Sequence, residues 1–306
     1  RRSSDLFLNT NKTYTAGLSG YKLWALKLND YVLLVKMRLS LVVVISSVLG
    51  YVIASEGNGI WSDLILLVSG GFLVTGAANA LNQVLEKDFD ILMSRTSNRP
   101  VATGRMKPSE GVMFAGISCL IGISLLALFN PVTALLGMLS LIIYAFVYTP
   151  LKRYNTLAVA VGAVPGALPV MIGMTAFEGT VSYLAVCLFA IQFLWQFPHF
   201  WSIGFLGYED YQKAGYKLLP ESSGGIDRSL GLSAVFYGIF IIPVIAVLYF
   251  SLNMSLFSTL FVLVLTLGYI LLSYIFHKRF DKPSALKLMF YSFFYLPLVL
   301  VFYWLM

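Results

Sequence analysis

Polar and charged side chains recur at helical spacing in residues 79–100, directly after a long apolar segment. Asn82, Glu86 and Asp90 are each four residues apart, so on a helix they form one stripe. Asn79 and Gln83 extend this stripe back into the apolar segment. Two carboxylates and an amide on one face can hold Mg²⁺, a hard cation usually bound by one or two carboxylates together with substrate phosphates.

Two arginines, Arg95 and Arg99, follow the stripe closely. The planar guanidinium suits phosphate recognition. Carboxylates that hold a metal and arginines that hold phosphate, where an apolar segment ends, indicate a lipid diphosphate as substrate. The alternative is that these charges are only the solvated end of a membrane helix, which is the commoner role of such loops.

A second polar stripe lies near the end of another apolar segment, where Gln192, Gln196 and His199 are spaced i, i+4 and i+7. Polar side chains at that depth usually face the interior of a helix bundle. Glu209 and Asp210 follow, and we expect them on the same side of the membrane as Glu86 and Asp90. His199 is either a hydrogen-bonded core residue or a residue that positions a ligand.

A third candidate segment is 148–153, which ends in Lys152 and Arg153. Both cations could bind phosphate, or they could be ordinary anchors at the cytoplasmic end of a helix. Tyr148, Trp195 and Trp201 could stabilise a carbocation through their π faces. In a chain with 15% aromatic residues, most such rings face lipid or pack against other side chains.

The elements that must position these residues are membrane helices. The mean hydropathy is +0.82 and only 11% of the residues are charged, which is typical of a polytopic membrane protein. A spanning helix needs about 20 apolar residues. By this measure we predict a cytoplasmic N-terminal segment, 1–38, and one domain, 39–306, whose nine spans lie near 39–55, 62–85, 111–129, 132–150, 156–177, 180–205, 229–251, 255–276 and 285–305.

The charges predict the orientation of these spans. All 21 Lys and Arg residues lie before the first span, in alternate loops or, for Lys287, at the adjoining end of the last span, whereas the opposite loops and span ends carry only acidic charges. The positive-inside rule therefore predicts a cytoplasmic or matrix-side N-terminus and an external C-terminus. Cys119 and Cys187 lie in apolar runs, so we expect no disulfide framework, and the two histidines exclude a multi-histidine metal cluster.

Four motifs in order resemble the intramembrane aromatic prenyltransferase superfamily, and within it the haem-farnesylating branch. The first acidic motif of that superfamily is similar to Asn82, Glu86, Asp88 and Asp90. The branch resemblance rests on Arg95 to Pro100, Tyr148 to Arg153, Trp195 to Trp201 and Asp210 to Pro220. The resemblance runs from about Lys36 to the C-terminus. It implies an all-α polytopic membrane protein, with nine transmembrane helices in a single bundle around a central cavity that opens to the cytoplasmic side.

The resemblance also implies substrates and residue roles. Farnesyl diphosphate and haem B would react to give haem O for terminal oxidase assembly, in the bilayer of a bacterial inner membrane or of the mitochondrial inner membrane. Partners would be haem-modifying or oxidase-assembly proteins, and no nucleic acid. The implied metal ligands, for Mg²⁺, are Asn82, Glu86, Asp88, Asp90 and Asp210. The implied diphosphate ligands are Arg95, Arg99, Lys152 and Arg153, and the implied haem and prenyl contacts are His199, Gln196, Trp195 and Tyr148.

The chain departs from the superfamily pattern at two positions. Glu86 stands where Asp is common, and Ala214 stands where a second Asp would complete the second acidic motif, which leaves the number of metal ions open. A sister enzyme that prenylates a quinone or chlorophyll precursor would share the acidic motifs. A small-molecule transporter is the non-enzyme alternative, but it would need polar groups reachable from both faces, and the outer face has almost none.

Overall fold

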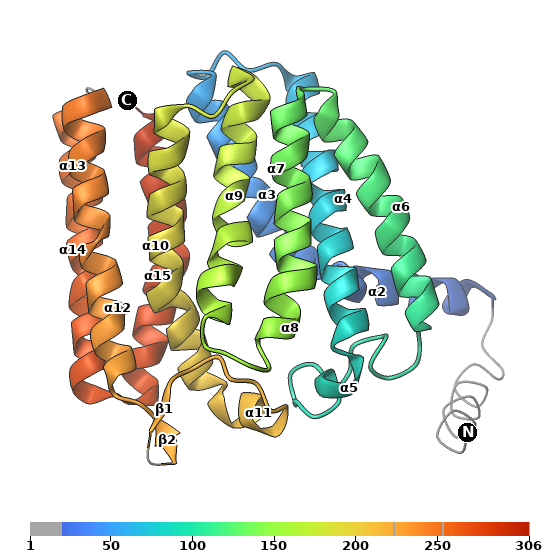
Figure 1. Ribbon diagram of the computed structural model, residues 1–306. Coiled ribbons are helices and arrows are strands. Elements are labelled where there is room, and N and C mark those ends of the chain that lie inside the picture. The colour runs from blue at the N-terminus through green and yellow to red at the C-terminus, as the bar shows by residue number, and fades with distance from the viewer. Residues whose placement is uncertain (1–19, 223, 253, 306) are drawn as a thin grey trace.

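The computed structural model describes residues 20–222, 224–252 and 254–305, and it is a bundle of long helices (Figure 1). In the described residues nine helices are long and apolar enough to span a membrane. They are α3 (Met37–Ala54), α4 (Trp61–Leu85), α6 (Pro108–Ala127), Pro131–Leu151, α9 (Ala158–Glu178), α10 (Tyr183–Leu206), Ser229–Leu252, α14 (Leu256–Arg279) and α15 (Lys282–Trp304). The nine predicted spans are confirmed, and the protein is a multi-pass membrane protein.

Two of these spans are interrupted. Pro131–Leu151 consists of α7 (Pro131–Ile142), a π-helical turn η1 (Ile143–Tyr148) and α8 (Thr149–Leu151). Ser229–Leu252 consists of α12 (Ser229–Ile239) and α13 (Ile241–Leu252). The π turn is not evident in the sequence. Such turns are often found at functional sites, and this one immediately precedes Thr149 and Lys152.

Helix α9 lies in the middle of the bundle and packs on α3, α7 and α10 (Figure 1). It is the most buried of the spans, with 72% of its most apolar window inside the protein. Its contact with α3 is backbone to backbone, because a Cβ atom on Gly173 would strike the carbonyl of Ser47 and one on Gly50 would strike that of Val170. Small residues therefore set the distance between α3 and α9.

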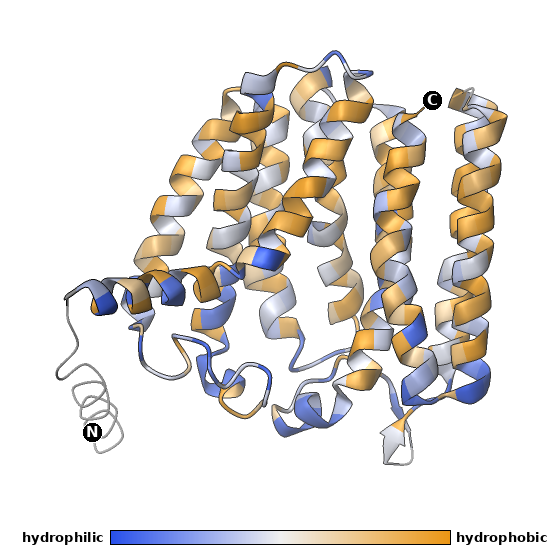
Figure 2. Ribbon diagram, turned by 180° about the vertical axis from the view of Figure 1, so that it is seen from behind, coloured by the Kyte–Doolittle hydropathy of each residue, from blue (hydrophilic) through white to orange (hydrophobic). Residues whose placement is uncertain are grey.

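Most of the described short elements lie at one end of the bundle, which we call the basic face because the Lys- and Arg-bearing loops are there. They are α5 (Lys87–Asp90), α11 (Tyr208–Lys213) and the antiparallel hairpin of β1 (Glu221–Ser222) and β2 (Gly225–Ile226). Figure 2 shows hydrophilic residues gathered at this end and hydrophobic residues along the spans. The hairpin was not predicted, and it is the only strand pair in the described chain.

Helix α2 (Gly20–Leu34) precedes the first span and was also not predicted. It lies across the bundle instead of along it (Figure 2). Polar contacts attach it to the rest of the protein: Lys27 pairs with Glu110 at 2.6 Å, and Asp30 accepts a hydrogen bond from Arg105 at 2.9 Å. Part of the predicted N-terminal segment is thus a helix that leads directly into α3.

Candidate active site on the basic face

The first predicted stripe is buried where α4 ends and α5 begins. Asn82, Glu86 and Asp90 are 1%, 2% and 0% exposed, respectively. Helix α4 ends at Leu85. Glu86, with φ −104°, departs from helical geometry, and α5 begins at the next residue. Carboxylates this deeply buried are costly unless they are paired or bind a metal, so their partners define the site.

Two basic side chains are paired with these carboxylates. Arg99 donates to both oxygens of Asp90, at 2.7 Å and 2.8 Å, and its Nη1 lies 4.0 Å from Glu86 Oε2. Lys152, also buried, forms an ion pair with Glu86 Oε1. The structure therefore brings Arg99 and Lys152, two of the four predicted phosphate ligands, to the predicted metal ligands.

Asn82 is the centre of a hydrogen-bond network that the sequence did not predict in full. Its Nδ2 donates to Glu86 Oε2 at 2.8 Å and to Thr149 Oγ1 at 3.1 Å. Its Oδ1 accepts from Lys36 Nζ at 3.0 Å. Lys36 and Thr149 are functional candidates that sequence reasoning missed. A lysine just before the first span looks like an ordinary anchor, and the position of Thr149 depends on the π turn.

The π turn orients the side of the site opposite α4. Thr149 donates to the carbonyl of Tyr144, five residues back, at 2.8 Å. The ring of Tyr148 lies under the Lys152 ammonium at 4.8 Å from the ring centroid, and the ring of Tyr216 lies at 5.3 Å. A side chain on Gly162 would strike the Tyr148 ring. Aromatic faces of this kind attract cations, so Tyr148 and Tyr216 help to hold Lys152 in place.

Burial and opposite charges shift the pKa values of these groups. Burial raises the pKa of Glu86, but attraction to Lys152 and Lys36 outweighs burial, and the net pKa is lowered. Burial, together with the nearby charge of Glu86, raises the pKa of Asp90 despite the opposing effect of Arg99. Burial and the charge of Arg99 lower the pKa of Lys36 well below its ordinary value. Desolvated charges of both signs at one place are typical of functional sites.

Asp210, on α11, contacts the loop that follows α5. Its Oδ2 accepts from Ser94 at 2.5 Å, and its Oδ1 lies 3.3 Å from Lys213. The Ser94 hydrogen bond is the main reason that the pKa of Asp210 is lowered. The next residues in the sequence are also in contact, because Arg95 donates to the Tyr211 hydroxyl at 3.0 Å. Asp210 is thus next to the 91–107 loop, although its described contacts are not with Glu86 or Asp90.

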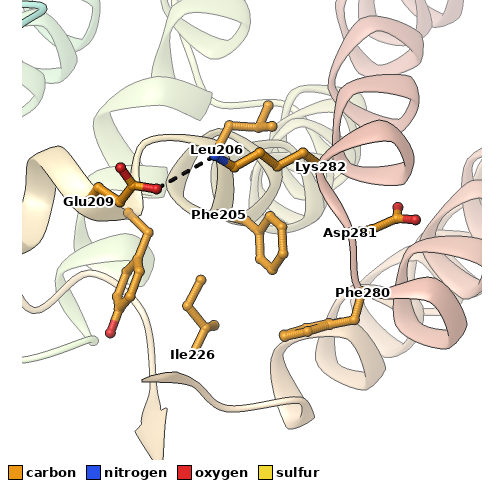
Figure 3. Close-up of a pocket in the computed structure, with 8 residues that line it drawn as sticks. Phe205, Leu206, Glu209, Ile226, Phe280, Asp281 and Lys282 are labelled. Atoms are coloured by element: carbon orange, nitrogen blue, oxygen red, sulfur yellow. Dashed lines mark ion pairs between the residues drawn. The ribbon is translucent and has the colours of Figure 1, made fainter. Parts of the chain in front are cut away.

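Glu209 faces away from this site. Figure 3 shows it at the mouth of a separate cleft of about 300 Å³, where it pairs with Lys282 at 3.6 Å. The cleft has an apolar floor that includes Phe205, Ile226 and Phe280. Glu209 is therefore not placed to substitute for the missing second Asp of the motif. Asp88, another predicted metal ligand, is exposed to solvent and is not brought to Asn82.

Arg153 holds the end of α4 rather than the carboxylates. It donates to the carbonyl of Leu85 at 2.9 Å, and its guanidinium stacks on Phe89 at 3.8 Å from the ring centroid. The backbone N–H of Lys217 donates to the carbonyl of Lys152 at 2.7 Å. These contacts join α4, α8 and the segment after α11 into one wall around Glu86.

The second predicted stripe divides between two neighbouring helices. Gln192 and Gln196 donate to the carbonyls of Gly166 and Ala163 on α9, at 3.0 Å and 2.9 Å. His199 instead faces α15, where its Nδ1 lies 2.6 Å from Ser292 Oγ. Trp195 stacks on the His199 ring at 4.8 Å. All four side chains are fully or largely buried, as expected, but they do not form one surface.

The donor set on α4 and α5 fits a magnesium diphosphate. No three His, Cys, Asp or Glu side chains form a metal cluster in the described residues; Glu86 and Asp90 both lie within 4.0 Å of Arg99, and the Asn82 amide offers a third oxygen, Oδ1. Few carboxylates suit Mg²⁺ when phosphate oxygens complete its coordination. Three cations, Lys36, Arg99 and Lys152, are available for those phosphates.

Comparison with known proteins gives consistent results. The chain is 46% identical over 215 residues to a protohaem IX farnesyltransferase of Flavobacterium johnsoniae, covering 70% of this chain and 71% of that one. It is 38% identical to that of Christiangramia forsetii, covering 90% and 92%. A UbiA homologue from Archaeoglobus fulgidus, solved with GPP and Mg²⁺, has the same fold, with a TM-score of 0.63 at 17% identity over 89% and 99% of the chains. Residues 43–296 match the UbiA prenyltransferase family, and the chain belongs to that family.

Proposed function

We propose that this protein transfers the farnesyl group of farnesyl diphosphate to a vinyl group of haem B, giving haem O and diphosphate. The observation that carries the proposal is the buried group of Asn82, Glu86 and Asp90 with its adjacent cations. Relatives that cover most of the chain are named protohaem IX farnesyltransferases, which supports haem as the acceptor.

The residues of the site would act on the leaving group. Asn82, Glu86 and Asp90 would hold Mg²⁺, which supplies charge neutralisation to the diphosphate. Arg99 and Lys152 would donate to diphosphate oxygens as negative charge develops on them, which is the kind of preorganised stabilisation that lowers a barrier most. Asp210 would fix the 91–107 loop through Ser94, and Arg95 would do so through Tyr211.

The bond changes need no side-chain nucleophile. The bond between C1 of the farnesyl group and the diphosphate oxygen breaks, and the vinyl group of haem supplies the electron pair for the new carbon–carbon bond. Water then adds to the resulting carbocation and loses a proton. Tyr148 lies beside Lys152 and is the aromatic ring best placed to stabilise positive charge near the leaving group.

Haem would be held near α10 and α15. His199 is buried between these helices, with Trp195 stacked on its ring and Ser292 on Nδ1. We assign His199 to positioning haem, through its iron or a propionate. With the acidic site on the cytoplasmic side of a bacterial inner membrane, as the charge distribution of the loops favours, both substrates would enter from the inner leaflet or the cytoplasm.

The test is a product assay with the purified full-length protein, haem B and farnesyl diphosphate, read by mass spectrometry with and without Mg²⁺. We expect haem O only when Mg²⁺ is present. Glu86→Gln should lower turnover by about 10²- to 10³-fold, the usual cost of removing one group that stabilises developing charge. Asp88→Asn is the matched control, because Asp88 is exposed, and it should retain turnover within about threefold.

Three outcomes would contradict parts of the proposal. Prenylation of a quinone precursor but not of haem would mean that the protein is a prenyltransferase with a different acceptor. Undiminished turnover by Glu86→Gln would remove the metal assignment. No prenyl transfer to any acceptor, with a folded and Mg²⁺-loaded protein, would overturn the proposed reaction.

A further inference from the structure

The chain makes a sharp, conformationally costly bend between α2 and α3. Helix α2 ends at Leu34 and α3 begins at Met37. Between them, Lys36 has φ 49° and ψ 57°, in the left-handed region. Residues with a side chain rarely adopt this conformation, and they persist in it only where the surroundings impose it. We call residues 33–36 the elbow.

Two amides of α4 impose this conformation. Gln83 Nε2 donates to the carbonyls of Leu33 and Leu34 at 2.9 Å and 3.0 Å. Asn79 Nδ2 donates to the carbonyl of Val35 at 3.3 Å. Carbonyls in the last turn of a helix lack intrahelical partners, and Gln83 supplies a partner to Leu34 and a second one to Leu33, which also accepts from the Lys36 N–H. At Val35, Ser40 Oγ donates alongside Asn79, at 2.6 Å. The elbow is therefore attached to α4 at three consecutive carbonyls.

The elbow and the candidate active site share one face of α4. Asn79, Asn82, Gln83 and Glu86 follow at helical spacing, so the residues that hold the elbow are one turn from those proposed to bind the metal. The elbow directs Lys36 back along this face, where its Nζ reaches Asn82 Oδ1 at 3.0 Å. Without the left-handed residue, the chain would continue in another direction and would not present this lysine to the site.

Lys36 also differs from the other cations of the site in its partner. Arg99 and Lys152 each pair directly with a carboxylate. Among the described ion pairs within 4.0 Å, none includes Lys36, whose polar contact is with a neutral amide oxygen. An incoming anion can therefore bind at the Lys36 Nζ without breaking an ion pair.

We propose that Lys36 binds the diphosphate of the prenyl substrate. Gln83 and Asn79 are positioning residues, because they hold the elbow in the conformation that directs Lys36 toward the diphosphate. This inference rests on the proposed function, because it assumes a prenyl diphosphate as the ligand. A haem propionate would offer the same anionic oxygens to the ammonium. The position of Lys36 beside Asn82, and not beside His199, favours the diphosphate.

The experiment measures binding as well as activity, with full-length protein in nanodiscs containing Mg²⁺. The probe is farnesyl thiodiphosphate, which the enzyme cannot ionise readily, and its affinity is measured by calorimetry. Haem B binding is measured separately by absorbance. Lys36→Met and Lys36→Gln should each lower the affinity for the probe about tenfold or more, the order expected when a charge-assisted contact is lost. Both variants should bind haem with unchanged affinity. Lys36→Arg should restore most of the probe affinity.

The positioning role is tested by a double-mutant cycle. Gln83→Met removes the two hydrogen bonds to the elbow and should weaken the probe in the same direction as Lys36→Met. Because Gln83 acts through Lys36, the double variant should bind the probe no worse than Lys36→Met alone. Lys22→Met is the control, since it removes one positive charge from an exposed position on α2, and it should not change probe affinity. Melting temperatures of all variants check folding.

Each contrary result has a distinct meaning. Wild-type probe affinity in folded Lys36→Met or Lys36→Gln would overturn the assignment of Lys36. Lost haem affinity with unchanged probe affinity would assign Lys36 to a propionate instead. Additive losses in the double variant would refute positioning through Gln83. If the wild-type protein itself did not bind the probe, the proposed function would fail before this inference was reached.

Discussion

At the scale of single residues, His199 shows how a neighbour can decide what a side chain is able to do. The Ser292 hydroxyl has one proton, and it donates this proton to the carbonyl of Met289 at 2.5 Å. When the hydroxyl proton goes to this carbonyl, the 2.6 Å contact between His199 Nδ1 and Ser292 Oγ is made with Nδ1–H as the donor. Neutral His199 then has its free electron pair on Nε2, and a hydrogen bond at the other ring nitrogen is typical of histidines that bind metals.

We therefore predict that His199→Ala weakens haem B binding by about tenfold or more and lessens the absorbance change on binding, as expected when a metal-positioning contact is lost. The affinity for farnesyl thiodiphosphate should stay within about twofold, because the described contacts of His199 do not include the cations of the proposed diphosphate site. Ser292→Ala, which removes only the hydrogen-bond acceptor, should give a smaller loss of haem affinity. Normal haem binding by His199→Ala together with loss of the diphosphate probe would place His199 in the other site.

At the scale of elements, the packing of α9 determines where two sets of site residues lie. Its glycines allow α3 and α10 to approach: a Cβ atom on Gly166 would strike the amide of Gln196, and one on Gly173 would strike the Ser47 carbonyl. Gln192 and Gln196 then bond to carbonyls of α9. The elbow leads directly into α3, so the α3–α9 contact also bears on the position of Lys36.

We predict that Gly173→Ala destabilises the protein by about 1–3 kcal/mol, the usual cost of overpacking a buried contact. A matched control is Gly116→Ala in α6, where an added Cβ atom would meet nothing within 4 Å. That change should be neutral or should stabilise the protein by about 0.5–1 kcal/mol, because alanine is the better helix former. Thermal or denaturant unfolding in detergent measures both. Equal effects of the two changes would show that helix propensity, and not the close approach of α3, governs Gly173.

At the scale of the whole molecule, charge is separated between the two ends of the bundle. The candidate site, α5 and α11 lie at the basic face with the loops that carry Lys and Arg (Figure 2). The loops and helix ends at the other end carry Glu56, Asp63 and Glu178 and no basic residue. The positive-inside rule places the basic end of the bundle on the cytoplasmic side, so we predict that the proposed diphosphate site also faces the cytoplasm.

This topology predicts a labelling pattern in intact cells. Single cysteines at Ser97 and Ser222 should be protected from a membrane-impermeant thiol reagent, whereas one at Asn58 should be labelled. The single cysteines would be introduced into a variant in which the half-buried Cys119 and the buried Cys187 are both replaced. Permeabilised cells, in which all three positions should react, serve as the control. The reverse pattern in intact cells would mean that the acidic motifs face outward.

The sequence by itself predicted the spans and the stripe of Asn82, Glu86 and Asp90. Both are local properties: hydropathy is summed along one segment, and helical periodicity fixes which residues of one helix share a side. The predicted span boundaries agree with the structure to within a few residues. The three residues of the stripe are indeed buried, and they lie next to the half-buried Arg99 and the buried Lys152.

Only the tertiary structure decided which neighbour each side chain meets. Periodicity placed Gln196 and His199 on one stripe, but α9 lies against one and α15 against the other. Lys36 enters the site because Gln83, far away in sequence, holds the elbow in a conformation that Lys36 would not adopt by itself. Helical spacing fixes the direction of a side chain relative to its own helix, whereas its partner is set by the packing of whole helices against one another.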